Sequence, residues 1–172
     1  HNSSGWKSWN GTLGSLAGGV IGAFNGFFVQ TTSADPSIVI PTGAKQDSAK
    51  SFLGKQVVQA EPFYFSLEVR SDSGLANKAW FQFSEGGEFG IDGSDAYELA
   101  PLSRNYVSLA SVLDDTTKLD INSLPFITEF FEVPLELNTT EIGSHTFAID
   151  DVNFPEDWEI ELFDSETETS SN

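Results

Sequence analysis

The alternation of apolar and polar side chains between residues 63 and 70 constrains the fold of this chain more than any other feature. The apolar set is Phe63, Phe65, Leu67 and Val69, and the intervening residues are Tyr64, Ser66, Glu68 and Arg70. Successive side chains of a β-strand point to opposite faces of a sheet. The run therefore predicts a strand with one face in a core and the other in water.

A second alternating run follows the first after a short turn. Ser71–Gly74 holds turn-forming residues, and apolar side chains again take alternate positions in Lys78–Ser84. Two such runs joined by a turn are typical of an antiparallel hairpin. The alternation predicts one shared core face, made of Phe63, Phe65, Leu67, Val69, Phe81 and Phe83.

Short apolar runs between clusters of Gly, Pro, Asn, Asp and Ser predict the remaining strands. They cover residues 26–31, 37–40, 106–111, 118–121, 131–137, 144–149 and 158–163. Turn signals at this spacing, with almost no helix signal, favour an all-β fold and in particular an antiparallel β-sandwich.

Composition along the chain suggests three regions. Residues 1–60 form an N-terminal Gly-rich and strand region that contributes to the sandwich, residues 61–164 form the main β-sandwich, and residues 165–172 form a flexible acidic Ser/Thr tail. Six of the sixteen residues from Gly11 to Gly26 are glycine. We expect that segment to be a loop or a bulged crossing and not a helix.

Charge excludes one large class of partners. The formal net charge is −18, and residues 61–172 hold 4 basic residues against 24 acidic ones. Such a chain repels nucleic acid and anionic lipid surfaces. No run approaches 18 apolar residues, so no membrane span is expected. Because the chain has no Met and begins with His1, we expect it to be a processed or excised piece.

An acidic, glycine-rich loop is the candidate cation site. Glu85, Glu88, Asp92 and Asp95, followed by Glu98, lie within fourteen residues that also hold four glycines. Flexible, oxygen-rich loops suit Ca²⁺, which makes Ca²⁺ the candidate cofactor. The spacing is not that of an EF-hand, and the alternative interpretation is a solvated acidic surface.

Aromatic side chains supply a second candidate site. Flat rings can stack on sugars, and the candidate carbohydrate-binding residues are Trp6, Trp9, Tyr64 and Trp80. The alternation places Tyr64 and Trp80 on the wet face of the hairpin. The alternative is that a loop or a neighbouring domain buries these rings.

Residues suited to catalysis are few. The chain has no Cys, and its one internal histidine, His145, lies within a predicted strand. No nucleophile elbow of the GxSxG type accompanies it. We therefore expect a noncatalytic protein.

Several strings, in chain order, resemble a module found in the carboxyl-terminal region of large secreted cell-surface proteins of Bacteroidota. They read GAFNGFFVQ at 22–30, DPSIVIP at 35–41 before Ala44-Lys45, FGIDGSDAYEL at 89–99 and LDINSLP at 119–125. Residues 133–135, 144–147 and 158–164 take the places of further strings of that family. Many of its members are exported by type IX secretion.

The resemblance implies a secreted, noncatalytic structural or adhesive β-sandwich module that packs with neighbouring modules or subunits at the cell surface. A carbohydrate-binding module that takes up polysaccharide is the alternative. In the family, a segment that begins with Gly-Trp usually precedes the matched region and a further strand commonly follows it, so the resemblance implies a sandwich that lacks edge strands at its ends. We therefore expect the strand around Trp6–Trp9 or the one at Trp158–Phe163 to pair with a strand from another protein or another part of the parent chain.

Overall fold

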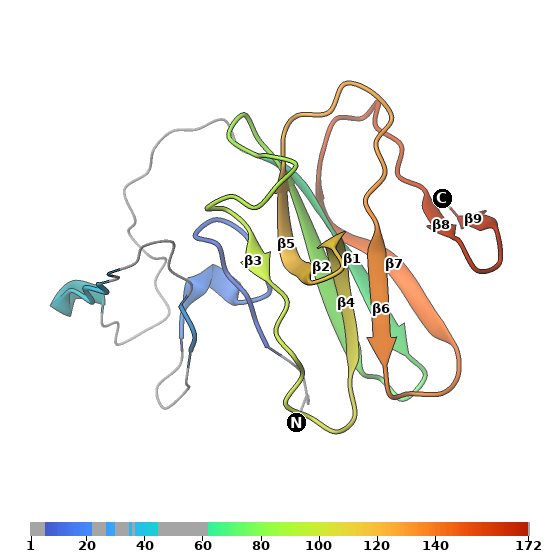
Figure 1. The fold of residues 1–172 in the computed structure, drawn as a ribbon, viewed down its shortest axis with the longest axis horizontal. Coiled ribbons are helices and arrows are strands. Elements are labelled where there is room, and N and C mark those ends of the chain that lie inside the picture. Colours follow the sequence, from blue (N-terminus) through green and yellow to red (C-terminus); the bar gives the residue numbers. More distant parts are fainter. Residues whose placement is uncertain (1–5, 22–26, 30–34, 36, 45–61, 172) are drawn as a thin grey trace.

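The computed structural model describes residues 6–21, 27–29, 35, 37–44 and 62–171. The fold is all-β, as predicted (Figure 1). Nine strands and two short 3₁₀ turns make up the described part: η1 Ala17–Gly19, η2 Thr42–Ala44, β1 Phe63–Ser71, β2 Ala76–Phe83, β3 Ala96–Tyr97, β4 Val107–Asp114, β5 Thr117–Leu124, β6 Leu135–Thr139, β7 His145–Asn153, β8 Leu162–Asp164 and β9 Thr169–Ser171.

The central hairpin has the predicted register. Phe63 pairs with Phe83, Phe65 with Phe81 and Leu67 with Ala79 across β1 and β2. Leu67, Val69, Phe81 and Phe83 are buried, and Phe63 and Phe65 pack against them. The predicted core face is confirmed, because a period of two places all these side chains on one side.

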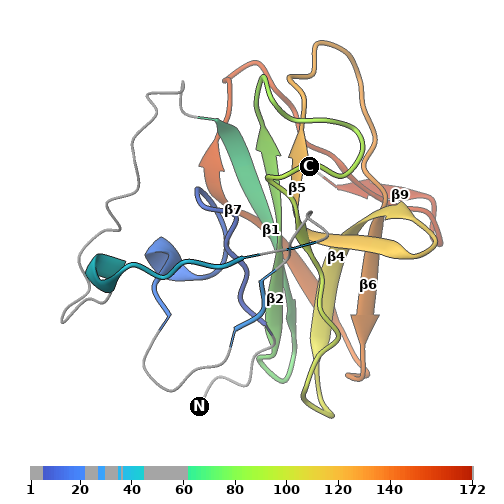
Figure 2. The same cartoon turned by 60° about the vertical axis from the view of Figure 1, so that its left-hand side comes forward.

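Seven strands form one sheet, in the order β6-β4-β5-β2-β1-β7, with β3 on β5. The sheet curls into a half-barrel, so β4 and β6 lie in front of β1, β2 and β7 in Figure 1 and the curl is seen from the side in Figure 2. β4 pairs with β6 through residues 107–111 and with β5 through residues 111–114. The core lies between the two halves of this bent sheet, which take the place of the two layers expected of a sandwich.

One strand pair departs from the predicted antiparallel arrangement. β2 and β5 run parallel, with Trp80 opposite Ile121 and Phe83 opposite Leu124. A parallel pair needs a long crossover, and the chain between β2 and β5 provides one through β3 and β4. Alternation fixes which face a side chain occupies but carries no information on strand direction.

Most of the predicted strands exist with shifted ends. Those at 106–111, 118–121, 131–137 and 144–149 correspond to β4, β5, β6 and β7. The strand predicted at 37–40 is wrong, because Ile38, Val39 and Ile40 are exposed and pair with no neighbour in the described part of the chain. Of the strand predicted at 26–31, residues 27–29 are described and are not a strand.

The two ends of the sheet differ from the prediction. Trp6–Trp9 is not a strand, and the run predicted at 158–163 forms only β8 at its end. β8 pairs with β9, so residues 169–171 of the predicted flexible tail form a hairpin strand. The Asp164 carboxylate stabilises the turn by accepting hydrogen bonds from the Glu166 N–H at 2.9 Å and the Thr167 hydroxyl at 2.8 Å. In the described sheet, β6 and β7 lie at the two ends of the strand order and the two-residue β3 pairs only with β5, so each of these three strands has an unpaired edge.

Candidate functional site

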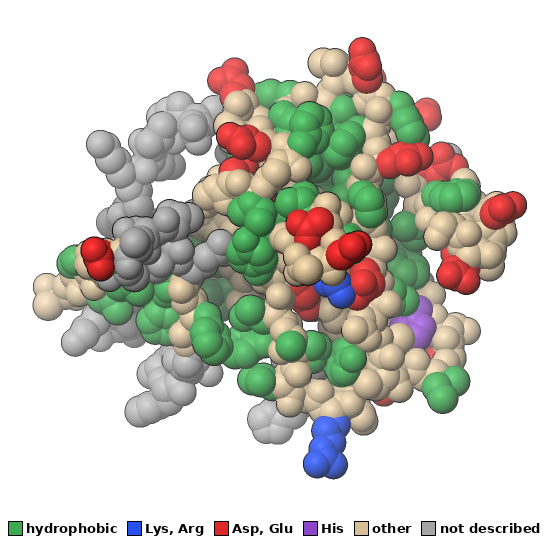
Figure 3. Space-filling model, viewed as in Figure 1, with side chains coloured by type: hydrophobic (Ala, Val, Ile, Leu, Met, Phe, Trp, Pro, Cys, Tyr) green, Lys and Arg blue, Asp and Glu red, His purple; other side chains and the backbone are tan. Residues whose placement is uncertain are grey.

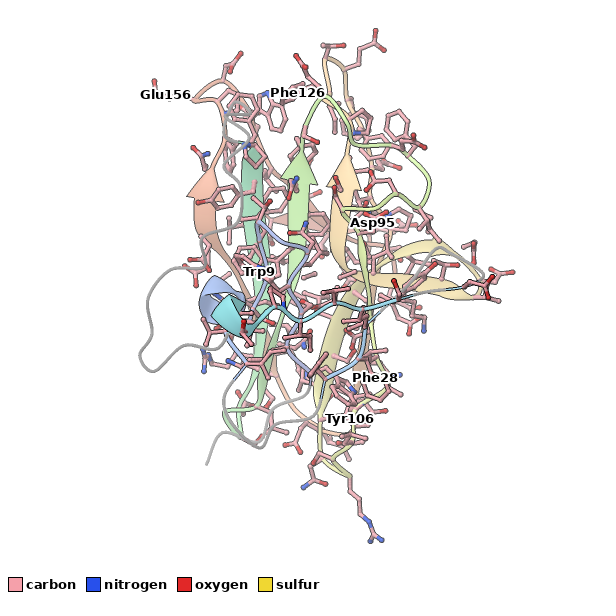
Figure 4. All side chains as sticks on the ribbon, turned by 90° about the vertical axis from the view of Figure 1, so that its left-hand side faces the viewer. Trp9, Phe28, Asp95, Tyr106, Phe126 and Glu156 are labelled. Atoms are coloured by element: carbon pink, nitrogen blue, oxygen red, sulfur yellow. The ribbon has the colours of Figure 1, made fainter. Side chains whose placement is uncertain are left out.

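The N-terminal segment 6–21 covers the outer face of the sheet, which the alternation suggested was wet. Figure 4 shows Trp9 of this segment in front of the strands. Asn10 donates hydrogen bonds to the Gln82 side chain at 3.2 Å and to the Ser94 carbonyl at 2.7 Å. The Trp6 indole N–H donates to the Ala100 carbonyl at 2.9 Å. The polar face therefore binds a polar segment of the same chain.

A pair of carboxyl groups lies beneath this segment. Asp120 is only 6% exposed, and its carboxylate accepts a hydrogen bond from the Ser8 hydroxyl. Its carboxyl group also hydrogen-bonds with that of Glu98, which accepts a hydrogen bond from the Ser108 hydroxyl at 2.5 Å. Two carboxyl groups can hydrogen-bond to each other only when one of them holds a proton.

The position of Asp120 follows from a β-bulge. β3 places Ala96 opposite Ile121 and Tyr97 opposite Leu119, so Asp120 is the extra residue of β5. At the same position β5 changes neighbours, since residues 117–119 pair with β4 and residues 121–124 pair with β2. A bulge redirects its extra side chain. Here it lies at the corner of the curled sheet and contacts the covering segment.

Burial controls the electrostatics of the pair. Burial raises the pKa of Asp120 to about 7, the Ser8 hydrogen bond opposes this, and the charge of Glu98 adds to it. Burial also raises the pKa of Glu98, against the hydrogen bonds from Ser108 and Asp120 and the charge of Lys118. Lys118 itself forms an ion pair with Glu136. With its pKa raised to about 7, Asp120 holds a proton at mildly acidic pH, and its hydrogen bond with Ser8 anchors segment 6–21 to the sheet.

The acidic loop uses two of its carboxylates to bind its own backbone. Asp92 accepts hydrogen bonds from the N–H groups of Ser94 at 2.6 Å and Glu88 at 3.1 Å. Asp95 accepts from the N–H groups of Asp92 and Ser123, each at 2.7 Å. Burial raises the pKa of Asp95 in spite of these bonds.

The predicted cation ligands are therefore not gathered around one point. Glu85 and Glu88 are exposed, Asp92 binds N–H groups within its own loop, and Asp95 holds the loop on β5 through the Ser123 N–H. Among the residues that the structure describes, no three His, Asp or Glu side chains come close enough together to hold a metal ion. Ca²⁺ binding by Glu85, Glu88, Asp92 and Asp95 stays a prediction that no contact favours.

The four predicted sugar-binding rings have different surroundings. Trp80 is 8% exposed, so its predicted exposure is wrong. Trp9 lies against Gly19, and Trp6 packs edge-on to Phe28 with ring centroids 5.0 Å apart. Tyr64 is half-buried, and no ring contact joins any two of these four residues. The prediction of a sugar-binding platform is wrong for Trp80, because segment 6–21 covers the face of the sheet that was expected to be exposed to water.

An apolar surface that the sequence patterns did not predict lies at one end of the sheet. We call Phe89, Ile91, Phe130 and Phe131 the aromatic surface; they are 60%, 42%, 86% and 39% exposed, respectively. Phe89 and Phe131 bring two loops together with ring centroids 5.0 Å apart. Figure 3 shows hydrophobic side chains at this upper end with acidic ones around them. The sequence feature that could have predicted this surface is the group of apolar residues between Leu124 and Val133.

In comparisons with known proteins, no family model, curated protein or solved structure matches this chain. The resemblance to Bacteroidota cell-surface modules therefore remains a prediction. In the described part of the chain, no helix has the length and apolarity needed to cross a bilayer.

Proposed function

We propose that this protein is a noncatalytic structural or adhesive module of a secreted or cell-surface assembly, and that the aromatic surface packs against a neighbouring protein module. The observation that carries this proposal is the exposure of Phe89, Phe130 and Phe131 on two loops that contact each other. Large exposed apolar patches on folded proteins usually mark interaction sites. Aromatic residues are also enriched at the centres of protein interfaces.

The charge of the two loops indicates which kind of protein can bind the aromatic surface. Glu85, Glu88, Glu129 and Glu132 lie on the same two loops and are exposed. A partner with an apolar centre and a basic rim complements such a surface. The extracellular setting rests on the resemblance of the sequence to secreted surface proteins, and the acidic composition is compatible with it.

Site-specific photo-crosslinking in the producing cell tests the proposal. A photoreactive residue replaces Phe130 in the protein as its cell makes it, and a matched control replaces Arg104, which is exposed in the loop between β3 and β4. We expect position 130 to yield a crosslink to one defined protein, identified by mass spectrometry, and position 104 to yield none. Equal crosslinking at both positions, or none at position 130, would contradict the proposal.

A polysaccharide panel tests the alternative of carbohydrate binding. Under our proposal the protein elutes from polysaccharide affinity gels without retardation, as does the Phe130→Ser variant. Retardation of the protein that is lost in Trp6→Ala would replace the proposed function with carbohydrate binding.

A further inference from the structure

The half-barrel is open between β6 and β7. These strands are the two ends of the strand order, and no Cα of β6 lies within 8 Å of a Cα of β7. Neighbouring strands in a sheet lie about 4.8 Å apart, so two strands that flank a third are about 10 Å apart. The two strands are therefore not paired with each other, and each keeps a free outer edge in the described sheet.

Core-facing side chains are left exposed along this opening. Leu137 of β6 pairs with the buried Leu109, and Ile149 of β7 pairs with the buried Leu67, so both point towards the core. Leu137 is nevertheless 36% exposed and Ile149 is 42% exposed. Apolar side chains in core-facing positions are normally covered by the next strand.

The free edge of β7 is the longer of the two. β7 has nine residues and β6 has five. The edge is regular from His145 to Asp150, and Asp151 then takes a positive φ of 47°. Such a kink ends regular pairing. A segment of about six residues can therefore pair along His145–Asp150.

Charge determines what can occupy this edge. From Glu129 to the end of the chain there are 13 acidic residues and no Lys or Arg. This region includes β6, β7 and the two strands that follow them. Along the edge itself the one carboxylate is that of Asp150, which Lys78 bridges at 2.7 Å. A second copy of the chain carries the same net charge of −18, which disfavours self-pairing. A segment with Lys or Arg at its solvent-facing positions is complementary to the acidic region from Glu129 onwards, of which β7 is part.

We infer that the free edge of β7 accepts an extended segment of another protein, in which apolar residues that cover Ile149 alternate with Lys or Arg. Main-chain hydrogen bonds to β7 supply affinity, and the alternation supplies specificity. This inference goes beyond the proposed function, because it uses a different surface of the molecule from the aromatic surface.

The probe is a synthetic peptide of about ten residues in which valine alternates with lysine and threonine. Two control peptides are a scrambled peptide of the same composition and one with glutamate in place of lysine. Binding is measured by fluorescence anisotropy with the intact 172-residue chain. We expect the alternating basic peptide to bind about tenfold or more tightly than either control.

Two protein variants locate the binding. Ile149→Ser and Ile142→Ser make the same chemical change, but Ile142 lies in the loop between β6 and β7 and is fully exposed. We expect Ile149→Ser to weaken peptide binding by about tenfold and Ile142→Ser to leave it unchanged. Circular dichroism confirms that each variant is folded. Amide exchange on the unmodified protein gives an independent readout, because pairing should slow exchange along His145–Asp150.

Three outcomes overturn the inference: no binding of the alternating peptide, equal binding of the scrambled peptide, or unchanged exchange in β7 when the peptide binds. Equal binding of the scrambled peptide shows attraction by charge alone. The Phe130→Ser variant separates the two proposals, because it should bind the peptide as the unmodified protein does. A failed crosslink at position 130 therefore leaves the peptide result standing, and the converse also holds.

Discussion

Phe65 shows what one side chain of the alternating strand contributes. Its ring stacks on Phe81 with centroids 4.7 Å apart and also contacts Phe83 and Phe154. We expect Phe65→Ala to lower the free energy of unfolding by about 3 kcal/mol, because it leaves a cavity in an aromatic cluster. Urea denaturation measures the change.

The matched control for Phe65 is Glu68→Ala in the same strand. Glu68 points to the other face, where it pairs with the exposed Arg70 at 2.5 Å. Exposed ion pairs contribute about 1 kcal/mol or less. A neutral Phe65→Ala together with a severe Glu68→Ala would mean that the two faces of β1 are exchanged.

Asp120 makes stability depend on pH in an unusual direction. Burial raises its pKa in the folded protein to about 7, above the ordinary value of 3.8. Between these two values the folded state holds a proton that the unfolded chain has lost. The proton held by Asp120 therefore adds to the free energy of unfolding. This stabilisation is fully present below about pH 4 and decreases as pH rises to about 7, by up to about 1.4 kcal/mol per pH unit.

Asp120→Asn tests this contribution. The amide keeps a hydrogen-bonding group near Ser8 but carries no charge, so we expect a higher unfolding temperature than the unmodified protein at about pH 8 and a smaller decrease between about pH 4 and pH 7. Glu159→Gln removes the same charge from an exposed side chain and serves as the control. If the two variants behave alike, net charge and not the buried pair causes the pH dependence.

At the scale of elements, Asn77 holds β4 over β2. Its side-chain carbonyl accepts a hydrogen bond from the Leu109 N–H at 2.9 Å, although β2 and β4 are not paired strands. Leu109 is 1% exposed, so water cannot replace this acceptor. We expect Asn77→Ala to cost about 1–3 kcal/mol of unfolding free energy, as for any buried donor left unsatisfied.

The control for Asn77 is Asn105→Ala, since Asn105 is exposed in the loop before β4. Chemical denaturation of both variants gives the comparison. Equal stability of the two would mean that β4 does not depend on the Asn77 contact for its position across the sheet.

The same elements show what the sequence could and could not predict. The core face of β1 and β2 depends only on a local period of two, and it is confirmed from Phe63 to Phe83. The curl at Ser111 and Asp120 depends on contacts between residues far apart in the chain, such as Asn77 with Leu109. No local pattern encodes such contacts.

The prediction that the outer face of the sheet is exposed to water was wrong for a related reason. The alternation of the hairpin predicted that Ser66 and Gln82 face water, yet both are buried, and so is Asp120 of β5, for which the sequence predicted no face. Alternation separates apolar from polar faces, but it cannot distinguish water from a polar covering segment. The candidate site was missed because Ser8 and Asp120 are 112 residues apart in the chain.

For the whole molecule, repulsion between acidic groups opposes the compact state. The net charge is −18. In the described residues the opposing attraction comes from Arg70–Glu68, Lys118–Glu136 and the bridges of Lys78 to Asp150 and Asp151. Such exposed pairs contribute little, so repulsion between like charges outweighs them.

Salt should therefore stabilise this protein. Raising NaCl from about 0.02 M to about 0.3 M shortens the Debye length from about 20 Å to about 6 Å, which screens repulsion between distant carboxylates more than attraction within close pairs. We expect the unfolding temperature, measured by calorimetry, to rise by several degrees at about pH 8. At about pH 4 many carboxylates hold protons, so the same increase in salt should have a smaller effect. A decrease in unfolding temperature with salt at about pH 8 would mean that the few ion pairs outweigh the net charge.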